Sequence, residues 1–485
     1  MATDNSTAPA IVWFRRDLRL ADNPALYAAV DSGRPLILVY VRETDAALSL
    51  SPGAAADWWL HHSLDALERA LGRHHGEIAL RTGEALALIP QLARETGAAE
   101  VFWNRLELPW IDQRDVCIAR DLKSSGVRPR AFRGATLTDA ERVMTKSGTP
   151  YKVFSAFWRA ASRDLDPRSP LPAPTHFHWA SNQPRGETLA DWALCPTQPD
   201  WASGFSERWT PGEDGAVAHL DRFLDAAIAD YPTDRDRPDR YGTSRLSPHL
   251  NWGEISPRTV WHRVQAQSEA GGTFKAGEKF LAELGWRDFA HYLMHHFDDL
   301  RTTNFNRAFD SYPWRNTPER IEAWQRGQTG IPMVDAGMRE LWATGWMHNR
   351  VRMITASYLI KHLNVHWKTG MAWFEDTLVD ADPAVNAASW QWVAGSGADA
   401  SPFFRIFNPA TQGEKFDPTG EYVRTWVPEL AGLEDGVIHA PWTASSNALA
   451  QAGIELGKTY PEPYVDLSVG REKALAAYKD MKEEA

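Results

Sequence analysis

The segment from Asp380 to Trp392 combines acidic, amide and indole side chains at spacings that could do chemistry. Pro383 suits the first position of a helix and Asp382 suits its N-cap, so a helix is predicted to start there. Asn386 and Trp390 follow Asp382 at four-residue steps, which places the three side chains on one helix face. By spacing alone, a capped helix with a buried tryptophan is the simpler interpretation. A ligand site needs support from other segments.

The turn from Tyr241 to Pro248 gives part of that support. It offers a glycine, three hydroxyl groups and an arginine ahead of a predicted helix. Backbone N–H groups, hydroxyls and a helix N-terminus are suitable ligands for a diphosphate. An ordinary turn rich in serine and threonine is the alternative.

Two predicted helices carry further polar groups on one face. Glu283, Trp286, Arg287 and Ala290 fall at i, i+3, i+4 and i+7, and a second stretch repeats this pattern with Asn349, Arg352 and Met353. Polar side chains among so many aromatic ones predict a lined cavity.

Tryptophan is unusually frequent, with 23 in 485 residues. Many of these side chains are expected to be packing anchors. The excess also suggests stacking on bases or a flat cofactor, or electron transfer through indoles.

The elements that position these residues divide the chain in two. Five β-rich runs alternate with helical stretches such as 54–73 and 84–96, which predicts a doubly wound parallel sheet that binds ligands at the carboxyl ends of its strands. The predicted strands are Ile11–Phe14, Pro35–Val41, Glu77–Arg81, Glu100–Trp103 and Pro129–Phe132.

The pattern then changes twice. Residues 136–207 are rich in Pro, Ser and Asp, with one short aromatic helix near 153–161, and are predicted to be an interdomain connection. From 208 to 485 helical periods dominate. The predicted fold is therefore an α/β domain over 1–135, a connection, and a mostly α-helical domain.

Bulk properties narrow the class of protein. A net charge of -11 argues against a protein that coats nucleic acid, so any contact with DNA would have to be local. Two separate cysteines, Cys117 and Cys195, offer neither a disulfide framework nor a paired-cysteine zinc site, and no metal site is predicted. The N-terminus lacks a signal-peptide pattern and no apolar run could span a bilayer. We expect a cytoplasmic protein, monomeric and without membrane contacts.

Several segments in order resemble the photolyase and cryptochrome flavoproteins, over about residues 10 to 465. The resemblance rests on Ile11–Leu26, Gly242–Pro248, Trp346–Met353, Asp380–Trp392 and Phe404–Pro409. It implies an N-terminal antenna domain and a helical domain that binds FAD and DNA.

The resemblance also implies roles around the flavin. Asp380 would pair with Arg352 near the ring, Asp382 would hydrogen-bond the flavin and Asn386 would face it. Trp390, Trp367 and Trp314 match the family's chain of three electron-carrying tryptophans. The other residues implied in cofactor binding are Tyr231, Thr243, Ser244, Leu246, Ser247 and Arg287.

For the substrate, the resemblance implies cyclobutane pyrimidine dimers in UV-damaged DNA. The pocket of such enzymes is matched by Glu283, Trp286, Asn349, Arg350, Met353 and Trp392. Glu283 would hydrogen-bond the dimer as a protonated or strongly hydrogen-bonded acid in an apolar pocket. Arg235, Arg350, Arg405 and Lys415 are candidate phosphate contacts.

Departures and alternatives remain. Ala290 stands where well-known members have Tyr, and Phe280 where they have Trp. The segment from Gly395 to Pro402 resembles the third class of bacterial dimer photolyases, which are related to plant cryptochromes. A blue-light photoreceptor of cryptochrome type is the alternative function, and a DNA-binding module that stacks on bases is a more distant one. The antenna chromophore is expected to be methenyltetrahydrofolate, with a deazaflavin as the alternative.

Overall fold

A computed structural model gives the fold and describes residues 7–46, 48, 50, 53–163 and 165–484. The N-terminal part is a five-stranded parallel sheet with strand order β3-β2-β1-β4-β5. Its strands are β1 (Ala10–Phe14), β2 (Leu36–Arg42), β3 (Ile78–Thr82), β4 (Glu100–Asn104) and β5 (Arg128–Phe132). All five predicted strands are confirmed to within one residue at each end.

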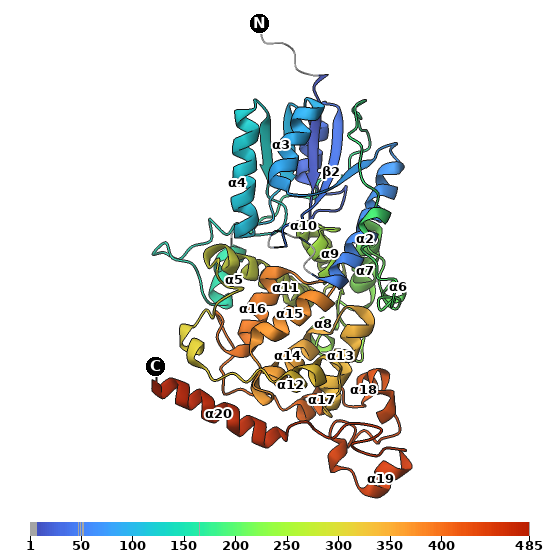
Figure 1. Cartoon of the computed structure of the whole chain (residues 1–485), viewed down its shortest axis with the longest axis vertical. Coiled ribbons are helices and arrows are strands. Elements are labelled where there is room, and N and C mark those ends of the chain that lie inside the picture. The colour runs from blue at the N-terminus through green and yellow to red at the C-terminus, as the bar shows by residue number, and fades with distance from the viewer. Residues whose placement is uncertain (1–6, 47, 49, 51–52, 164, 485) are drawn as a thin grey trace.

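Helices cover the sheet, which explains why β1 is buried along its whole length. These helices are α1 (Pro24–Asp31), α2 (Ala54–Gly72), α3 (Ala85–Thr96) and α4 (Pro109–Ser124). The strand order reverses between β1 and β4, and the carboxyl ends of both strands point toward the helical part of the molecule (Figure 1). This is the edge at which open α/β sheets bind ligands.

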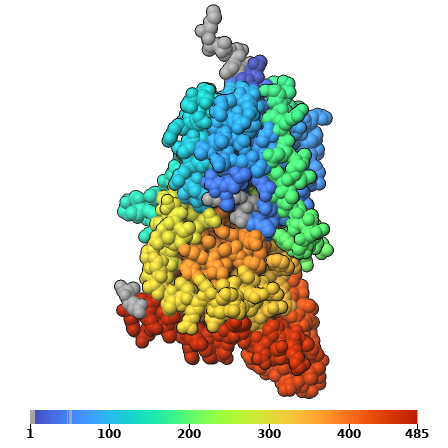
Figure 2. Space-filling model, viewed as in Figure 1, coloured from blue at the N-terminus to red at the C-terminus, as the bar shows by residue number. Residues whose placement is uncertain are grey.

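The predicted connection is packed against both domains. It contains α5 (Phe154–Arg163), the 3₁₀ helix η2 (Ala190–Trp192) and α6 (Phe205–Arg208). Trp179 forms a bridge with Leu36 of β2, and Glu187 forms one with Leu80 of β3. Figure 2 shows this green segment along the side of the N-terminal domain. The buried rings of Trp192 and Phe205 help to hold it there. The short aromatic helix predicted near 153–161 is α5.

The remaining described residues are helical, as predicted, with one isolated bridge and no strand. Helices α11, α14, α15 and α16 surround the centre of this domain, and α20 lies along its outer edge (Figure 1). No helix in the described part of the chain is both long and apolar enough to span a membrane. The elements are α7 (Glu213–Ala226), α8 (Tyr231–Asp234), α9 (Ser247–Trp252), α10 (Pro257–Gly271), α11 (Phe274–His296), η3 (Arg307–Ser311), α12 (Pro318–Gln325), α13 (Pro332–Thr344), α14 (Asn349–Ser357), the π-helix η4 (Tyr358–His362), α15 (Trp367–Thr377), α16 (Pro383–Ala394), α17 (Pro409–Phe416), α18 (Glu421–Trp426), η5 (Pro428–Leu430), η6 (Pro441–Thr443), α19 (Ser446–Gln451) and α20 (Leu467–Glu484).

Candidate flavin and substrate site

The helical domain holds a cavity of about 440 Å³. The helix faces predicted from spacing meet there, because α11, α14 and α16 all contribute to the wall. Residues predicted for the site that line this cavity are Arg235, Glu283, Trp286, Arg287, Asn349, Arg352, Met353, Asp380, Asp382, Asn386, Trp390 and Trp392. Ala290, the departure noted in the sequence, lines it too.

Asp380 and Arg352 form an ion pair in the wall of the cavity. Arg352 Nη2 lies 2.8 Å from Asp380 Oδ2, and Arg352 Nε donates to the carbonyl of Met347 at 2.7 Å. The second carboxylate oxygen, Asp380 Oδ1, is buried and has no hydrogen-bond partner among the described residues. A buried acceptor without a donor is costly, which marks this atom as a contact for a ligand.

Asp382 is the N-cap of α16, as predicted. Its Oδ1 accepts hydrogen bonds from the N–H groups of Ala384 and Val385, and its Oδ2 accepts one from His291 Nε2 at 2.9 Å. Burial alone would raise the pKa of Asp382, but His291, Arg287 and Arg16 hold that pKa well below its usual range. The carboxylate is therefore ionised and fixed in place.

Asn386 follows one turn later on the same helix. Its Nδ2 donates to the carbonyl of Met371 on α15 at 3.1 Å. This bond fixes the amide at the cavity wall.

Glu283 lines the cavity as a hydrogen-bonded acid, one of the two states expected from the sequence. Its carboxylate forms an ion pair with Arg235, which follows α8, and Lys279 Nζ on the preceding turn of α11 lies 3.9 Å away. The apolar wall of the cavity is therefore joined at Glu283 by two positive charges. Arg235, expected at a phosphate, is engaged with Glu283.

Trp286 has one covered face. Phe154 of α5 stacks on it with ring centroids 3.7 Å apart and an interplanar angle of 13°. Trp286 is 36% exposed. The N–H of Phe154 donates to Asp399 Oδ2 at 3.0 Å, so the stacking ring is itself anchored.

The other candidate phosphate contacts lie outside the cavity. Arg350 Nη2 is 2.8 Å from Asp236 Oδ1, and its guanidinium lies over the ring of Phe416. Arg405 is exposed and forms no ion pair among the described residues. Lys415 lies near the face of Phe416.

The turn predicted for a diphosphate lies beside the cavity, not in its wall. Ser247 begins α9, and its hydroxyl accepts a hydrogen bond from Trp346 Nε1 at 3.2 Å. The guanidinium of Arg352 lies over the ring of Trp346, 5.8 Å from its centroid. Trp346 therefore connects the turn to the cavity, which Arg352 lines. Thr243, Ser244 and Leu246 belong to this turn and Tyr231 begins α8, and none of the four lines the cavity.

The three predicted electron-carrying tryptophans are spatially ordered. The Trp390 ring packs over Gly370, at a position that a Cβ atom of residue 370 would occupy. Trp367 lies one turn before Gly370 on α15 and donates from Nε1 to Asn304 Oδ1 at 2.8 Å. His366 lies between Trp367 and Trp314, with ring centroids 5.5 and 5.0 Å away.

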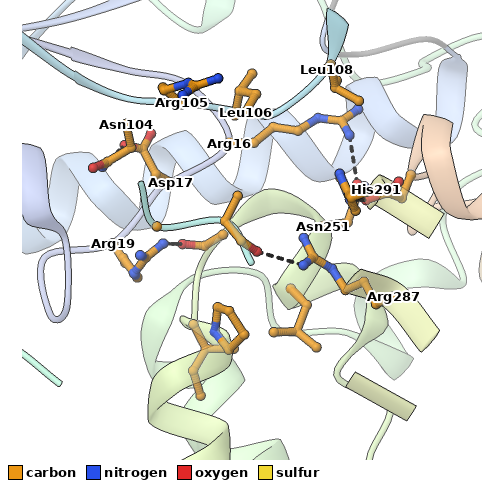
Figure 3. Close-up of a pocket in the computed structure, with 17 residues that line it drawn as sticks. Arg16, Asp17, Arg19, Asn104, Arg105, Leu106, Leu108, Asn251, Arg287 and His291 are labelled. Atoms are coloured by element: carbon orange, nitrogen blue, oxygen red, sulfur yellow. Dashed lines mark hydrogen bonds and ion pairs between the residues drawn. The ribbon is translucent and has the colours of Figure 1, made fainter. Parts of the chain in front are cut away.

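The crevice of the N-terminal sheet has a different character. At the carboxyl ends of its strands, Arg15 Nη1 pairs with Asp115 at 2.6 Å, and Arg114 bridges Asp115 and Glu43 at 2.8 and 2.7 Å. Both guanidinium groups lie over the ring of Trp13. What remains between the domains is a cavity of about 30 Å³ (Figure 3).

Some residues at these sites were not predicted. His291 falls at i+8 from Glu283, so extending the same helical face by one turn indicates it. Phe154 was visible only as part of a short aromatic helix. Arg16 and Asn251, which line the small cavity, come from distant segments and gave no local signal.

The two-domain fold and its polar cavity define a protein with an FAD-binding helical domain. Residues 280–480 match the family "FAD binding domain of DNA photolyase", and residues 10–175 match "DNA photolyase". The chain belongs to the photolyase and cryptochrome family, as the sequence motifs indicated.

Relatives include both enzymes and photoreceptors. A deoxyribodipyrimidine photo-lyase from Agrobacterium fabrum is 51% identical over 98% of each chain. Cryptochrome-1 from Arabidopsis thaliana is 38% identical over 97% of this chain and 70% of its own. A crystal structure of a class III photolyase from Agrobacterium tumefaciens superposes with a TM-score of 0.95 at 51% identity, covering 100% of this chain and 99% of that one.

The residues present fit FAD. Asp380 Oδ1 has no hydrogen-bond partner among the described residues, and neither do two buried donors near the turn and the start of α14, Arg245 Nε and His348 Nε2. Arg245 lies over the ring of Trp346, 5.1 Å from its centroid, and His348 is the N-cap of α14. An acceptor at the cavity and donors toward the turn match a ligand with a polar ring and a diphosphate.

Proposed function

We propose that this chain is a light-driven DNA repair enzyme that splits cyclobutane pyrimidine dimers. The observation that carries the proposal is the meeting of Glu283, Trp286, Asn349, Met353 and Trp392 at one cavity, beside the residues that fit FAD. The name of the 51% identical relative, deoxyribodipyrimidine photo-lyase, supports it.

In this proposal the aromatic residues hold the lesion. Photolyases are known to act on a nucleotide extruded from the duplex, and a damaged, poorly stacked base is easier to extrude. Trp286 presents its free face to the dimer, because Phe154 covers the other face. Trp392, on α16, offers the second aromatic wall.

The polar residues are proposed to orient the dimer in the cavity and to stabilise its complex with the protein. Glu283 accepts a hydrogen bond from Arg235 and is proposed to contact the dimer with its remaining capacity, while Asn349 lies exposed at the cavity mouth. Met353 lines the same cavity. Arg350, Arg405 and Lys415 are proposed to contact DNA phosphates, a local cationic surface on an acidic protein.

Asp380, Arg352, Asp382, Asn386 and Arg287 are proposed to hold the flavin ring, and Tyr231, Thr243, Ser244, Leu246 and Ser247 its phosphates and ribityl chain. When bound in its reduced form and excited by light, FAD supplies an electron to the dimer and takes it back after the ring opens. Trp390, Trp367 and Trp314 are proposed to conduct electrons inward from the surface. The fixed Asp382 carboxylate and the Asp380–Arg352 pair set the charge around that site.

Repair is tested with reduced, FAD-loaded protein and thymine-dimer DNA under blue light and in darkness. Loss of dimers only in the light supports the proposal. Glu283→Ala is expected to lower the repair yield per absorbed photon, with Glu278→Ala on the exposed side of α11 as the matched control. If wild type leaves the dimers intact in the light, the repair function is wrong.

A cryptochrome-type photoreceptor is the second candidate. The 38% identity to Arabidopsis cryptochrome-1 favours it specifically, as does a TM-score of 0.88 to a Synechocystis cryptochrome at 29% identity. Intact dimers after illumination, together with normal photoreduction, would select this function.

For the antenna we propose methenyltetrahydrofolate rather than a deazaflavin. The crevice at the switch point of the sheet, where a flavin-like ligand of an open α/β domain is expected, leaves only about 30 Å³ beside the Arg15–Asp115–Arg114 network. Extraction and absorption spectra of the purified protein test this choice, and a deazaflavin band would overturn it. The proposal also includes a monomeric, cytoplasmic enzyme, which light scattering and cell fractionation can check.

A further inference from the structure

Lys361 is a buried lysine to which the proposed repair reaction gives no role. It belongs to the π-helix η4, between α14 and α15, and is 2% exposed. Burial lowers its pKa well below the usual range of a lysine, and no carboxylate pairs with it among the described residues. Lysine is rarely buried without such a partner, and π-helical turns are frequent at functional sites. The contacts of its amino group therefore call for an explanation.

The amino group of Lys361 joins the end of α16 to the chain that follows it. Nζ donates to the carbonyl of Ala394, the last residue of α16, and to the carbonyl of Phe403, at 3.3 Å in each case. It also lies 3.4 Å from the centroid of the Phe403 ring. The last carbonyls of a helix lack partners within the helix and carry partial negative charge, so a lysine donor is favourable there.

Residues 395–405 form a rim segment that leads from α16 to the surface. Gly395 ends α16 with a positive φ of 86°, which lets the chain turn back, and Ala398 lines the cavity. Beyond Phe403 the side chain of Arg405 is exposed. Because Arg405 is a proposed phosphate contact, the rim segment connects the flavin helix with the surface proposed for DNA.

The rim segment also contacts the supports of both proposed aromatic walls. The N–H of Ser401 donates to the carbonyl of Trp392 at 3.2 Å. Asp399 Oδ2 accepts from the N–H of Phe154 at 3.0 Å, and the Phe154 ring stacks on Trp286. A shift of the rim segment would therefore change the surroundings of both walls together.

The end of the rim segment at Phe403 is held by its ring as well as by its carbonyl. The ring is 2% exposed and stacks on Tyr478 of α20, with ring centroids 4.5 Å apart and an interplanar angle of 13°. The rings of Phe309 and Tyr312 lie 5.8 and 5.4 Å away. These contacts fix the side chain, and Lys361 supplies the donor for the backbone beside it.

We propose that Lys361 is a positioning residue for the substrate side of the cavity. It fastens the rim segment to the C-terminal end of α16, so that the two aromatic walls and Arg405 keep their relative positions. Lys361 does not line the cavity itself and acts through these groups. The consequence for DNA binding rests on the proposed repair function, whereas the fastening of the rim segment does not.

Lys361→Met tests the fastening, because methionine fills a similar space but has no N–H donor. In the FAD-loaded variant, hydrogen exchange followed by mass spectrometry is expected to be faster for the backbone amides of residues 395–405. The loss of one hydrogen bond of ordinary strength corresponds to exchange that is roughly 2- to 12-fold faster. The amides of α4, in the other domain, should exchange as in wild type.

The consequence for the substrate is measured separately. Affinity of Lys361→Met for dimer-containing DNA is expected to fall by a factor in the same range, while flavin content and the repair yield per absorbed photon at saturating DNA stay unchanged. Lys473→Met, the same substitution at an exposed position of α20, is the matched control and should behave as wild type.

Phe403→Leu provides a second test should Lys361→Met fail to fold. It keeps the carbonyl that accepts from Lys361 but removes the ring beside the amino group, so a smaller increase in exchange is expected in the same residues. Unchanged exchange of residues 395–405 in either folded variant overturns the proposal.

Two further outcomes would also overturn it. Faster exchange throughout the helical domain together with loss of flavin would make Lys361 a general packing residue. Faster exchange of the rim segment at unchanged DNA affinity would remove its role on the substrate side. If wild type fails to repair dimers, the repair function is wrong, and the exchange of residues 395–405 still decides whether Lys361 positions the rim segment.

Discussion

The crevice of the N-terminal sheet and the cavity of the helical domain treat buried charge in opposite ways. In the crevice, the charges of Arg15, Arg114, Asp115 and Glu43 are paired with one another. In the cavity, Asp380 keeps one oxygen unpaired, and His348 and Arg245 keep unpaired donors nearby. Both sites lie where their folds would accept a ligand.

The difference separates a structural network from a binding site. Polar groups that already have partners gain little free energy from a ligand. An unpaired buried group carries the full cost of its desolvation, and a hydrogen bond from a ligand offsets that cost. Perturbed or buried charge alone therefore does not mark function. An unpaired oxygen of a charged group in a cavity wall, such as Asp380 Oδ1, is a stronger indication.

The largest effect that tests this contrast is expected in the crevice. Asp115→Ala leaves Arg15 and Arg114 without their shared carboxylate and is expected to cost about 3–5 kcal/mol in free energy of unfolding. Flavin content per folded molecule should not change. Denaturant titration and flavin absorbance measure the two quantities.

The control for this test is Asp121→Ala on the same helix, where the 3.9 Å pair with Arg94 is half exposed and worth at most about 1 kcal/mol. Loss of flavin in Asp115→Ala at unchanged stability would contradict the structural reading of the crevice.

The next test removes the unpaired acceptor. Asp380→Asn keeps the shape of the side chain but removes its charge, and is expected to weaken FAD binding by about 1.5–3 kcal/mol, or roughly 10- to 150-fold. Flavin release on dilution, followed by fluorescence, measures the change. Asp239→Asn, which breaks the Arg237 pair outside the cavity, serves as control. Equal flavin affinity in both variants would remove Asp380 from the flavin site.

A smaller effect is expected from the connection. Phe154→Ala removes the ring behind Trp286, and such aromatic pairs contribute about 0.5–1.5 kcal/mol. Affinity for dimer-containing DNA should fall roughly 2- to 12-fold, while flavin content and photoreduction stay unchanged. Phe154→Tyr should restore affinity. A loss of flavin together with affinity would indicate a general packing defect instead.

The smallest expected effect is the loss of stability at mildly acidic pH that His348 causes. Burial lowers the pKa of His348 to about 3, so this imidazole is neutral in the folded protein but takes up a proton near pH 6.5 when unfolded. The contribution of neutral His348 to the free energy of unfolding is complete well above pH 6.5 and is lost as the pH falls below that value. Between pH 7 and 6 the loss is about 0.7 kcal/mol.

His348→Asn, which can still cap α14, should show a correspondingly flatter dependence in denaturant titrations. Burial raises the pKa values of Asp335 and Asp417 to about 6, so both bind protons more readily in the folded state than in the unfolded state. They therefore offset part of the loss of stability that His348 causes as the pH falls. The difference between wild type and variant is therefore the quantity to measure. No difference over this range would mean that His348 is not held neutral.

Local sequence predicted the regular elements well. Strand positions followed from apolar runs, and the start of α16 followed from Asp382 and Pro383. The three helix faces of the cavity followed from spacing, since residues on one face of a helix must share an environment. The ends of the domains, placed at 135 and 207, stay predictions.

Contacts between distant segments could not be predicted. The pairing of Arg235 with Glu283 depends on how α8 approaches α11, and the stacking of Phe154 depends on where the connection crosses Trp286. Neither position has a local pattern that reveals its partner. The roles of the site residues likewise came from the family resemblance and remain to be measured.

The proposed electron path through Trp390 depends on Gly370, a residue without a side chain. The Trp390 indole occupies the space beside its Cα, so any larger residue would displace that ring. In genetic terms, if Trp390 conducts electrons as proposed, a single codon change at this position would impair photoreduction without changing any tryptophan or any residue proposed to contact the flavin. A screen for light-insensitive mutants should therefore recover this position alongside the tryptophans.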